Sequence, residues 1–172
     1  MKISTWNVNS VNARIEHLEK FIKKDQSDIY LLQELKTIED GFPKEIIKNA
    51  GYYSYVNGQK AWNGVAILSK EKLEITNTSI PKYDDPNARF IETEIQLKKI
   101  KKNIKLINIY LPNGNPIETE KFDYKIKWMK KFNSYIQELK DNNIPIIISG
   151  DFNIIPTDDD VYSPENFKKK NK

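Results

Sequence analysis

The sequence predicts an α/β protein with a mixed, largely antiparallel sheet system and covering helices. A strand, an amphipathic helix and a second strand follow one another over residues 2–34, which is typical of a βαβ unit. Further strand-like segments occupy residues 52–111. A long amphipathic helix over residues 120–141 then precedes an apolar strand. No repeat or linker divides the 172 residues, so we expect one domain.

The N-terminal elements follow from the apolar pattern. Residues 2–8 (KISTWNV) read as a strand that ends in a polar cluster, where Ser10 or Asn12 is suited to cap a helix. Apolar residues at helical spacing predict that helix (Ile15, Leu18, Phe21, Ile22). Residues 28–34 form a short apolar run that ends in a carboxylate. A short helix is expected over residues 43–50, with Pro43 in its first turn.

The remaining elements are mainly strands. We expect them over residues 52–56, 64–69, 72–79, 90–97 and 104–111, with turns at intervening Gly, Pro and Asn residues. In the helix over residues 120–141, apolar side chains recur at steps of three and four, and Asn142 ends it. Ile146–Ile148 predict the middle of a buried strand. Residues 163–172 are read as a polar, disordered tail.

Composition excludes several classes of protein. Because the chain has no cysteine, disulfides and thiolate metal sites are excluded, and we expect a cytoplasmic location. No apolar stretch is long enough to cross a bilayer, and the N-terminus lacks a signal-peptide layout, so no membrane partner is expected. The formal net charge of +4 slightly favours polyanions such as nucleic acid. A general bias toward Lys, Ile and Asn explains this charge equally well.

Oxygen-bearing side chains end four of the predicted strands (Asn7, Glu34, Tyr110, and Asp151 with Asn153). One such residue is usually a turn or cap, but four favour a ligand site where strand ends gather. In an extended backbone Asp151 and Asn153 share a face, and Phe152 is expected to face the core. With no cysteine and one histidine in the chain, these oxygen donors predict Mg²⁺ or Mn²⁺ rather than Zn²⁺.

Five segments resemble, in order, the motifs of exodeoxyribonuclease III-type apurinic/apyrimidinic endonucleases, within the endonuclease/exonuclease/phosphatase superfamily. They are WNVNSVNAR (6–14), LLQELK (31–36), GQKAWNGVAILSK (58–70), NIYLPNG (108–114) and SGDFNIIPTDDDV (149–161). The resemblance extends to about Tyr162. It implies that residues 1–162 are the N-terminal portion of one four-layered α/β sandwich of the DNase I-like type, incomplete at the C-terminus.

The resemblance also implies a function and roles for residues. It indicates a monomeric, Mg²⁺-dependent hydrolase of base excision repair that cleaves double-stranded DNA at abasic sites and trims 3′ ends. It assigns four residues to the metal site (Asn7, Glu34, Asp151, Asn153) and four to DNA binding (Gln59, Lys60, Trp62, Asn113). Asp151 would orient or deprotonate water, Asn153 would hold this nucleophile, and Tyr110 would lie against the scissile phosphate. For residues 59–62, an ordinary hairpin loop is an equally good interpretation.

The motif pattern of the family continues past the last residue of this sequence. Family members carry further strands, a second metal-site aspartate and a closing Ser-Asp-His whose histidine acts as general base or phosphate ligand. His17 does not match that position, and we expect it at the surface or partly packed. We therefore expect a partial sequence, or a truncated chain of low activity and stability with open sheet edges.

Two other hypotheses stand beside the DNA-repair nuclease. One is a sister phosphoesterase of the same superfamily, acting on RNA, inositol phosphates or lipid. The other is an inactive fragment that lacks the catalytic histidine. The segments GQKAWNGVAILSK and NIYLPNG favour DNA repair.

Overall fold

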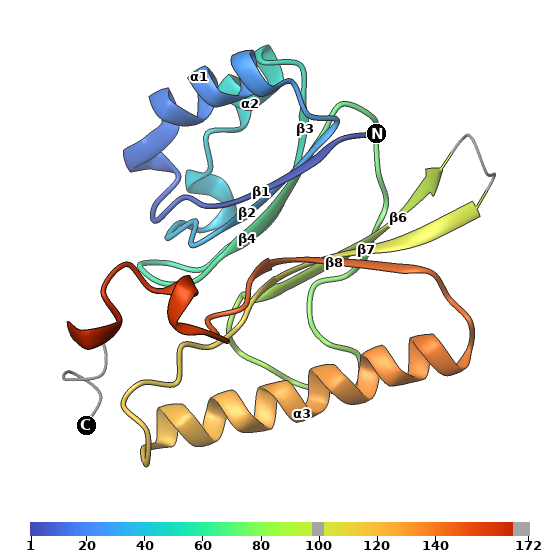
Figure 1. Cartoon of the computed structure of the whole chain (residues 1–172). Helices are drawn as coiled ribbons and strands as arrows, with labels where there is room; N and C mark the ends of the chain where they lie inside the picture. Colours follow the sequence, from blue (N-terminus) through green and yellow to red (C-terminus); the bar gives the residue numbers. More distant parts are fainter. Residues whose placement is uncertain (98–101, 167–172) are drawn as a thin grey trace.

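The computed structural model describes residues 1–97 and 102–166, which form four layers (Figure 1). Two four-stranded sheets pack face to face, and helices cover their outer faces. The first sheet has the order β1-β2-β4-β3 (Ile3–Asn7, Ile29–Gln33, Val65–Ser69, Tyr53–Asn57), and the second has the order β5-β6-β7-β8 (Ile75–Asn77, Phe90–Leu97, Lys102–Tyr110, Ile146–Asp151). Three α-helices complete the layers: α1 (Ile15–Asp25), α2 (Lys44–Asn49) and α3 (Glu120–Asp141). The predicted α/β sandwich is confirmed.

Each sheet contains one parallel pair of strands. β1 pairs with β2 and β7 pairs with β8 in parallel, and the other pairs are antiparallel. A helix connects each parallel pair, α1 in the first sheet and α3 in the second, as parallel crossovers require. Asn7 lies beside Gln33, and Tyr110 beside Asp151, in the strand registers. The C-terminal ends of these four strands therefore gather at one side of the sandwich (Figure 1).

Apolar side chains fill three interfaces between the layers. Along β2, Tyr30 and Leu32 pack toward the helices of the first sheet, whereas Ile29 and Leu31 pack between the sheets. Successive side chains of β2 point to opposite faces of the sheet, and both faces are covered. Every residue of β2 is therefore buried. Trp128 and its neighbours on α3 form the third cluster, against the outer face of the second sheet.

A buried polar link joins the two sheets. Gln33 Nε2 donates a hydrogen bond to Asn108 Oδ1 (2.8 Å), and Asn108 Nδ2 donates to the backbone carbonyls of Leu32 (3.0 Å) and Ala66 (2.9 Å). Because buried amides are costly unless paired, this link favours one relative placement of the sheets. Gln33 ends β2 and Asn108 lies two residues before the end of β7, so the link also aligns the side chains that follow.

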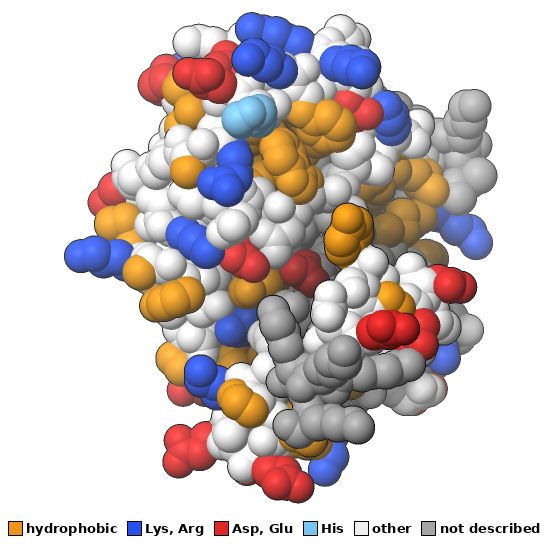
Figure 2. All heavy atoms as spheres, turned by 60° about the vertical axis from the view of Figure 1, so that its left-hand side comes forward, with side chains coloured by type: hydrophobic (Ala, Val, Ile, Leu, Met, Phe, Trp, Pro, Cys, Tyr) orange, Lys and Arg blue, Asp and Glu red, His pale blue; other side chains and the backbone are white. Residues whose placement is uncertain are grey.

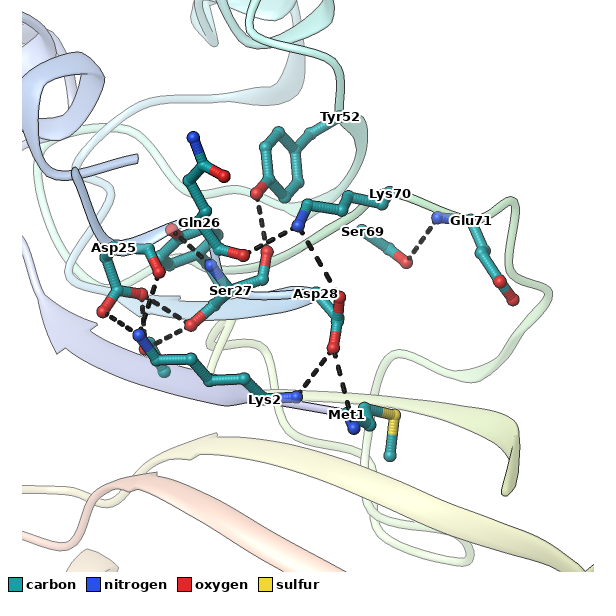
Figure 3. A network of polar contacts seen from close by, with 12 residues as sticks. Met1, Lys2, Asp25, Gln26, Ser27, Asp28, Tyr52, Ser69, Lys70 and Glu71 are labelled. Carbon is teal, nitrogen blue, oxygen red and sulfur yellow. Dashed lines mark hydrogen bonds and ion pairs between the residues drawn. The ribbon is translucent and has the colours of Figure 1, made fainter. Parts of the chain in front are cut away.

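A second polar network fastens the start of β1 to the end of α1 (Figure 3). Lys2 Nζ lies 2.6 Å from Asp25 Oδ1, and Asp25 Oδ2 accepts from the hydroxyl groups of Ser27 (2.5 Å) and Ser4 (3.0 Å). The hydrogen bonds from Lys2 and Ser27 hold the pKa of Asp25 well below its usual range. The Lys2 backbone N–H donates to Asp28 Oδ2 (2.7 Å). This end of β1 is thus anchored far from the strand ends described above.

Some predicted boundaries differ from the structure. β5 is shorter than the predicted strand over residues 72–79, because its pairing with β6 shifts register between Ile75 and Asn77. The prediction that Ile146–Ile148 are buried is wrong. Every residue of β8 is partly exposed, because β8 lies at the edge of its sheet. The predicted polar tail at residues 163–172 lies outside the described residues from residue 167 onward.

Each sheet has two edge strands within the described residues, β1 and β3 in the first sheet and β5 and β8 in the second. Of these, β1 and β8 lie close to each other, and each pairs on one side only. The segment that follows β8 exposes Phe152, Ile154 and Ile155, each by more than 40%. Across the described ranges, the structure contains no helix with the length and apolarity to cross a membrane.

Candidate active site

One network connects the four strand ends that the sequence singled out. Asn7 ends β1, Tyr110 ends β7, Asp151 ends β8, and Glu34 directly follows β2. Asn7 Nδ2 donates to Glu34 Oε1 and to Asp151 Oδ2, at 2.8 Å in each case. The Tyr110 hydroxyl donates to Glu34 Oε1 at 2.9 Å. Residues from both sheets thus converge on two carboxylates.

Glu34 is held ionised by its neighbours. It stands in the left-handed backbone region (φ +54°), so the chain turns there and directs the side chain toward the strand ends. Lys36 Nζ lies 3.1 Å from Glu34 Oε2. Burial acts to raise the pKa of Glu34, but hydrogen bonds from Asn7, Lys36 and Tyr110 outweigh burial, so the pKa lies below its usual value.

Tyr110 is a neutral hydrogen-bond donor. Burial and the adjacent Glu34 carboxylate raise the pKa of Tyr110 to about 12, so the phenol keeps its proton at neutral pH. Arg89 packs its guanidinium 4.9 Å from the centre of the Tyr110 ring and donates a hydrogen bond to the Tyr110 carbonyl (3.1 Å). The Arg89 cation favours the phenolate, but its influence is smaller than that of burial and Glu34.

Asp151 and Asn153 come together through a turn rather than through an extended strand. Asn153 has φ +46°, and its backbone N–H donates to Asp151 Oδ1 at 2.9 Å. The prediction that Phe152 faces the core is wrong, because the chain turns directly after β8 and leaves Phe152 42% exposed. The predicted proximity of Asp151 and Asn153 is nevertheless found, since both line one hollow.

This hollow lies where the strand ends meet and has a volume of about 500 Å³. Its walls come from β1, from the turn after β8 and from the loop after β7 (among them Asn7, Asp151, Asn153 and Asn113). Figure 2 shows acidic side chains recessed near the centre of one face of the molecule, with basic and hydrophobic side chains around them. A partly open hollow of this size, with polar side chains beside apolar ones, can admit a segment of a larger ligand.

The donor set fits a hard divalent cation. Glu34 and Asp151 are linked through one amide, and the described part of the chain contains no group of three or more His, Cys, Asp or Glu side chains suited to a metal. Mg²⁺ commonly takes one or two carboxylates and completes its shell with water and substrate oxygens. Asn7 presents its nitrogen to the carboxylates, while its oxygen accepts from the Asn9 N–H (3.0 Å). Asn7 therefore orients the carboxylates in this arrangement.

The residues predicted to bind DNA lie in different surroundings. Asn113 is exposed at the hollow, with its Nδ2 3.5 Å from Asn153 Oδ1. The side-chain oxygen of Gln59 forms hydrogen bonds within the protein: it accepts from Asn63 Nδ2 (2.9 Å) and from the Ala88 N–H (3.0 Å). Lys60 is exposed, and Trp62 is 69% exposed.

The Trp62 ring lies next to the lysine that pairs with Glu34. Lys36 Nζ, which pairs with Glu34, is 5.9 Å from the centre of this ring. Trp62 is therefore placed beside Lys36, the partner of Glu34, whereas Gln59 stabilises its own loop through hydrogen bonds. His17 is exposed on α1, as expected.

Three site residues were not predicted from the sequence: Lys36, Arg89 and Lys125. Lys36 is part of the LLQELK segment, and its position two residues after Glu34 was a usable signal. Arg89 and Lys125 carried no such signal, because their partners lie 12 or more residues away in the sequence.

Comparisons with known proteins agree with this geometry. The model of the endonuclease/exonuclease/phosphatase family matches residues 4–171. Exodeoxyribonuclease III of Haemophilus influenzae is 35% identical over 99% of this chain, which covers 64% of that protein.

Two solved structures share the fold. An AP endonuclease from Archaeoglobus fulgidus has a TM-score of 0.86 at 32% identity, over 98% of this chain and 63% of its own. A 3′ phosphatase, NExo, from Neisseria, solved with a product DNA hairpin, has a TM-score of 0.85 at 34% identity, over 97% and 63%. The chain thus spans less than two thirds of the length of these relatives. On the family match and the shared fold, the chain belongs to the endonuclease/exonuclease/phosphatase family.

Proposed function

We propose that this chain carries the active site of a Mg²⁺-dependent DNA phosphodiester hydrolase of base excision repair, which incises at abasic sites and trims 3′ ends. The observation that carries this proposal is the Asn7 amide, which joins Glu34 and Asp151 where the strands of both sheets end. Attack on a phosphodiester places negative charge on phosphate oxygens. Two carboxylates that hold a hard cation, with neutral donors beside them, suit that charge.

Each residue of the network has a role in this proposal. Mg²⁺, when bound, supplies a Lewis acid for the phosphate oxygens, and Glu34 with Asp151 would hold it. Asp151 orients the attacking water and accepts its proton as the water oxygen bonds to phosphorus. The bond from phosphorus to the leaving sugar oxygen breaks, and that oxygen takes up a proton from solvent. Asn153 adds a neutral amide next to that water. The Tyr110 hydroxyl, which donates to Glu34 in the chain alone, would turn this hydrogen bond to a phosphate oxygen of the substrate. Neither side chain adds negative charge to repel the substrate.

The substrate is inferred from the relatives and from the exposed loop beside Lys36. An AP endonuclease shares this fold at more than 30% identity, and so does a 3′ phosphatase whose structure contains a product DNA hairpin. Lys60 and Trp62 are exposed on the loop beside Lys36, where a cation and an aromatic ring suit a nucleic-acid backbone and its bases.

A substrate panel tests this proposal. The 172-residue chain is incubated with Mg²⁺ and, separately, duplex DNA with one abasic site, duplex DNA with recessed 3′ ends, RNA, and an inositol phosphate. The proposal predicts Mg²⁺-dependent cleavage of the two DNA substrates, lost in EDTA and in Glu34→Gln. Hydrolysis of RNA or the inositol phosphate alone would indicate the sister phosphoesterase. Cleavage of none of the four would indicate an inactive chain.

A further inference from the structure

The ammonium group of Lys125 joins the two loops that frame the hollow. Lys125 lies on α3, in the outer layer, yet its Nζ donates to the Asn113 carbonyl (3.0 Å) and to the Asn153 carbonyl (2.7 Å). The first loop follows β7 and the second follows β8. One ammonium group thus donates hydrogen bonds to two backbone carbonyls from different segments, at a partly exposed position.

The loop after β7 is built around the Lys125 stem. Gly114 is buried and has φ +77°, and a methyl group at this position would come 2.5 Å from Lys125 Cδ and 3.0 Å from its Cβ. A side chain at residue 114 would therefore be strained by the backbone and would also displace the lysine. The close approach allows the lysine to reach past the first loop to the second.

The two asparagines held in this way are two of the amide side chains that line the hollow of the candidate active site. Asn113 Nδ2 lies 3.5 Å from Asn153 Oδ1, and Asn153 Nδ2 donates to the Leu111 carbonyl (2.8 Å). The Asn153 N–H in turn donates to Asp151 Oδ1 (2.9 Å). Displacement of either carbonyl would therefore move an amide side chain relative to the Asp151 carboxylate.

We propose that Lys125 is a positioning residue that clamps the Asn113 and Asn153 loops and so fixes both amides against Asp151. Its ammonium acts through the two backbone carbonyls, not on the substrate. This proposal rests on the proposed function for its effect on catalysis, but the clamp itself is a property of the chain alone. The effect on rate follows because a displacement of about 1 Å in a catalytic group can lower the rate about 100-fold.

Three variants test the clamp. Lys125→Met keeps the length of the stem and removes the ammonium, whereas Lys125→Arg keeps a cationic donor. Lys130→Met removes an exposed lysine from the same helix and serves as the matched control. If Lys125→Met fails to fold, as judged by circular dichroism, Lys125→Gln replaces it, because a neutral amide on a shorter side chain does not span both carbonyls.

The first measurement needs no activity. In ¹H–¹⁵N spectra of the 172-residue chain, the side-chain amide signals of Asn113 and Asn153 are expected to shift or broaden in Lys125→Met. They should stay near their wild-type positions in Lys125→Arg and in Lys130→Met. Unchanged Asn113 and Asn153 signals in Lys125→Met would overturn the clamp.

The second measurement separates positioning from substrate binding. With abasic duplex DNA and Mg²⁺, Lys125→Met is expected to lower kcat about 10- to 100-fold with little change in KM, and arginine is expected to restore most of the loss. A raised KM at unchanged kcat would show a direct phosphate contact and overturn the positioning role. If the wild-type chain does not incise this DNA, the proposed function fails, and the amide spectra still decide the clamp.

Discussion

Asn7 joins the two carboxylates of the candidate active site through a single amide nitrogen. An amide can do this without adding charge, and it fixes the side-chain angles of Glu34 and Asp151 before any cation arrives. Residues that orient metal ligands in this way commonly contribute 10- to 100-fold to metal affinity or activity, as an order of magnitude.

Asn7→Ala is therefore expected to weaken Mg²⁺ binding about 10- to 100-fold, because both carboxylates lose their common donor. Isothermal titration of the chain with MgCl₂ measures this change. Asn12→Ala, at an exposed position five residues away, is the control and should bind as the wild type does. Equal Mg²⁺ affinity in Asn7→Ala and in the wild type would show that Asn7 does not organise the site.

Tyr110→Phe removes one neutral donor and keeps the ring that packs on Arg89. The rate of DNA incision is expected to fall about 100-fold, which is typical for loss of one donor to a developing charge. Because the pKa of Tyr110 is raised to about 12, its loss should lower the rate equally across pH 6 to 9. A loss confined to the alkaline end of that range would instead indicate that the phenol titrates during catalysis.

The sequence predicted which side chains meet, but not all of the backbone geometry that brings them together. Asn7, Glu34, Tyr110 and Asp151 were identified because each ends an apolar strand. The orientation of Phe152 was predicted wrongly, because the prediction assumed that the extended strand continues past Asp151, where β8 ends. The left-handed conformation of Asn153 is stabilised by its bond to Asp151 and by its contacts with Leu111 and Lys125, which are distant in sequence.

At the scale of elements, one buried carboxylate connects the second sheet to α3. Glu92 on β6 is fully buried and accepts hydrogen bonds from Lys105 Nζ on β7 (2.8 Å) and the Tyr135 hydroxyl on α3 (2.5 Å). Thr76 and Asn77 of the β5 strand add two more donors. Burial raises the pKa of Glu92, but the bonds from Lys105 and these other donors outweigh burial and lower it.

Glu92→Gln is expected to reduce the free energy of unfolding by about 2 kcal/mol. The glutamine amide group replaces one acceptor oxygen and then faces the hydrogen-bond donors that surround the carboxylate. In the wild type, the folded pKa lies below the unfolded value of about 4.3. The contribution of Glu92 is therefore present above that unfolded value and is lost as pH falls through the folded pKa. Urea unfolding at pH 7 and pH 3 should show a smaller difference between the two proteins at pH 3. An equal difference at both pH values would contradict this assignment.

Element boundaries were predicted best where the pattern was long. Residues 120–141 form α3 as predicted, because six turns of regular apolar spacing leave little ambiguity. The short strand β5 was predicted too long, since its pairing with β6 is irregular and nothing local marks where it stops. The order of the strands within each sheet was beyond prediction, because it depends on long-range pairing.

At the scale of the whole molecule, the open edges of β1 and β8 lie next to an exposed apolar segment. Ile154 and Ile155 are both more than 40% exposed beyond β8. Unpaired edges beside apolar surface favour association between chains.

A variant with Ile154→Lys and Ile155→Lys is expected to remain monodisperse at higher concentration than the wild type. Dynamic light scattering over a concentration series measures this, and Ile46→Lys, which changes an exposed isoleucine on α2, is the control. If the double variant associates at the same concentration as the wild type, another surface governs association.

The central claim is that Glu34, Asp151 and their shared amide form a Mg²⁺-dependent site for DNA phosphodiester hydrolysis. It is tested most directly by single-turnover incision of a duplex with one abasic site, in Mg²⁺, by the wild-type chain and by Asp151→Asn. The wild type is predicted to release one product cut at the abasic site. Asp151→Asn, which keeps the shape of the side chain, is predicted to cut at least about 100-fold more slowly. Equal rates in the two proteins, or incision by the wild type that persists in EDTA, would contradict the claim.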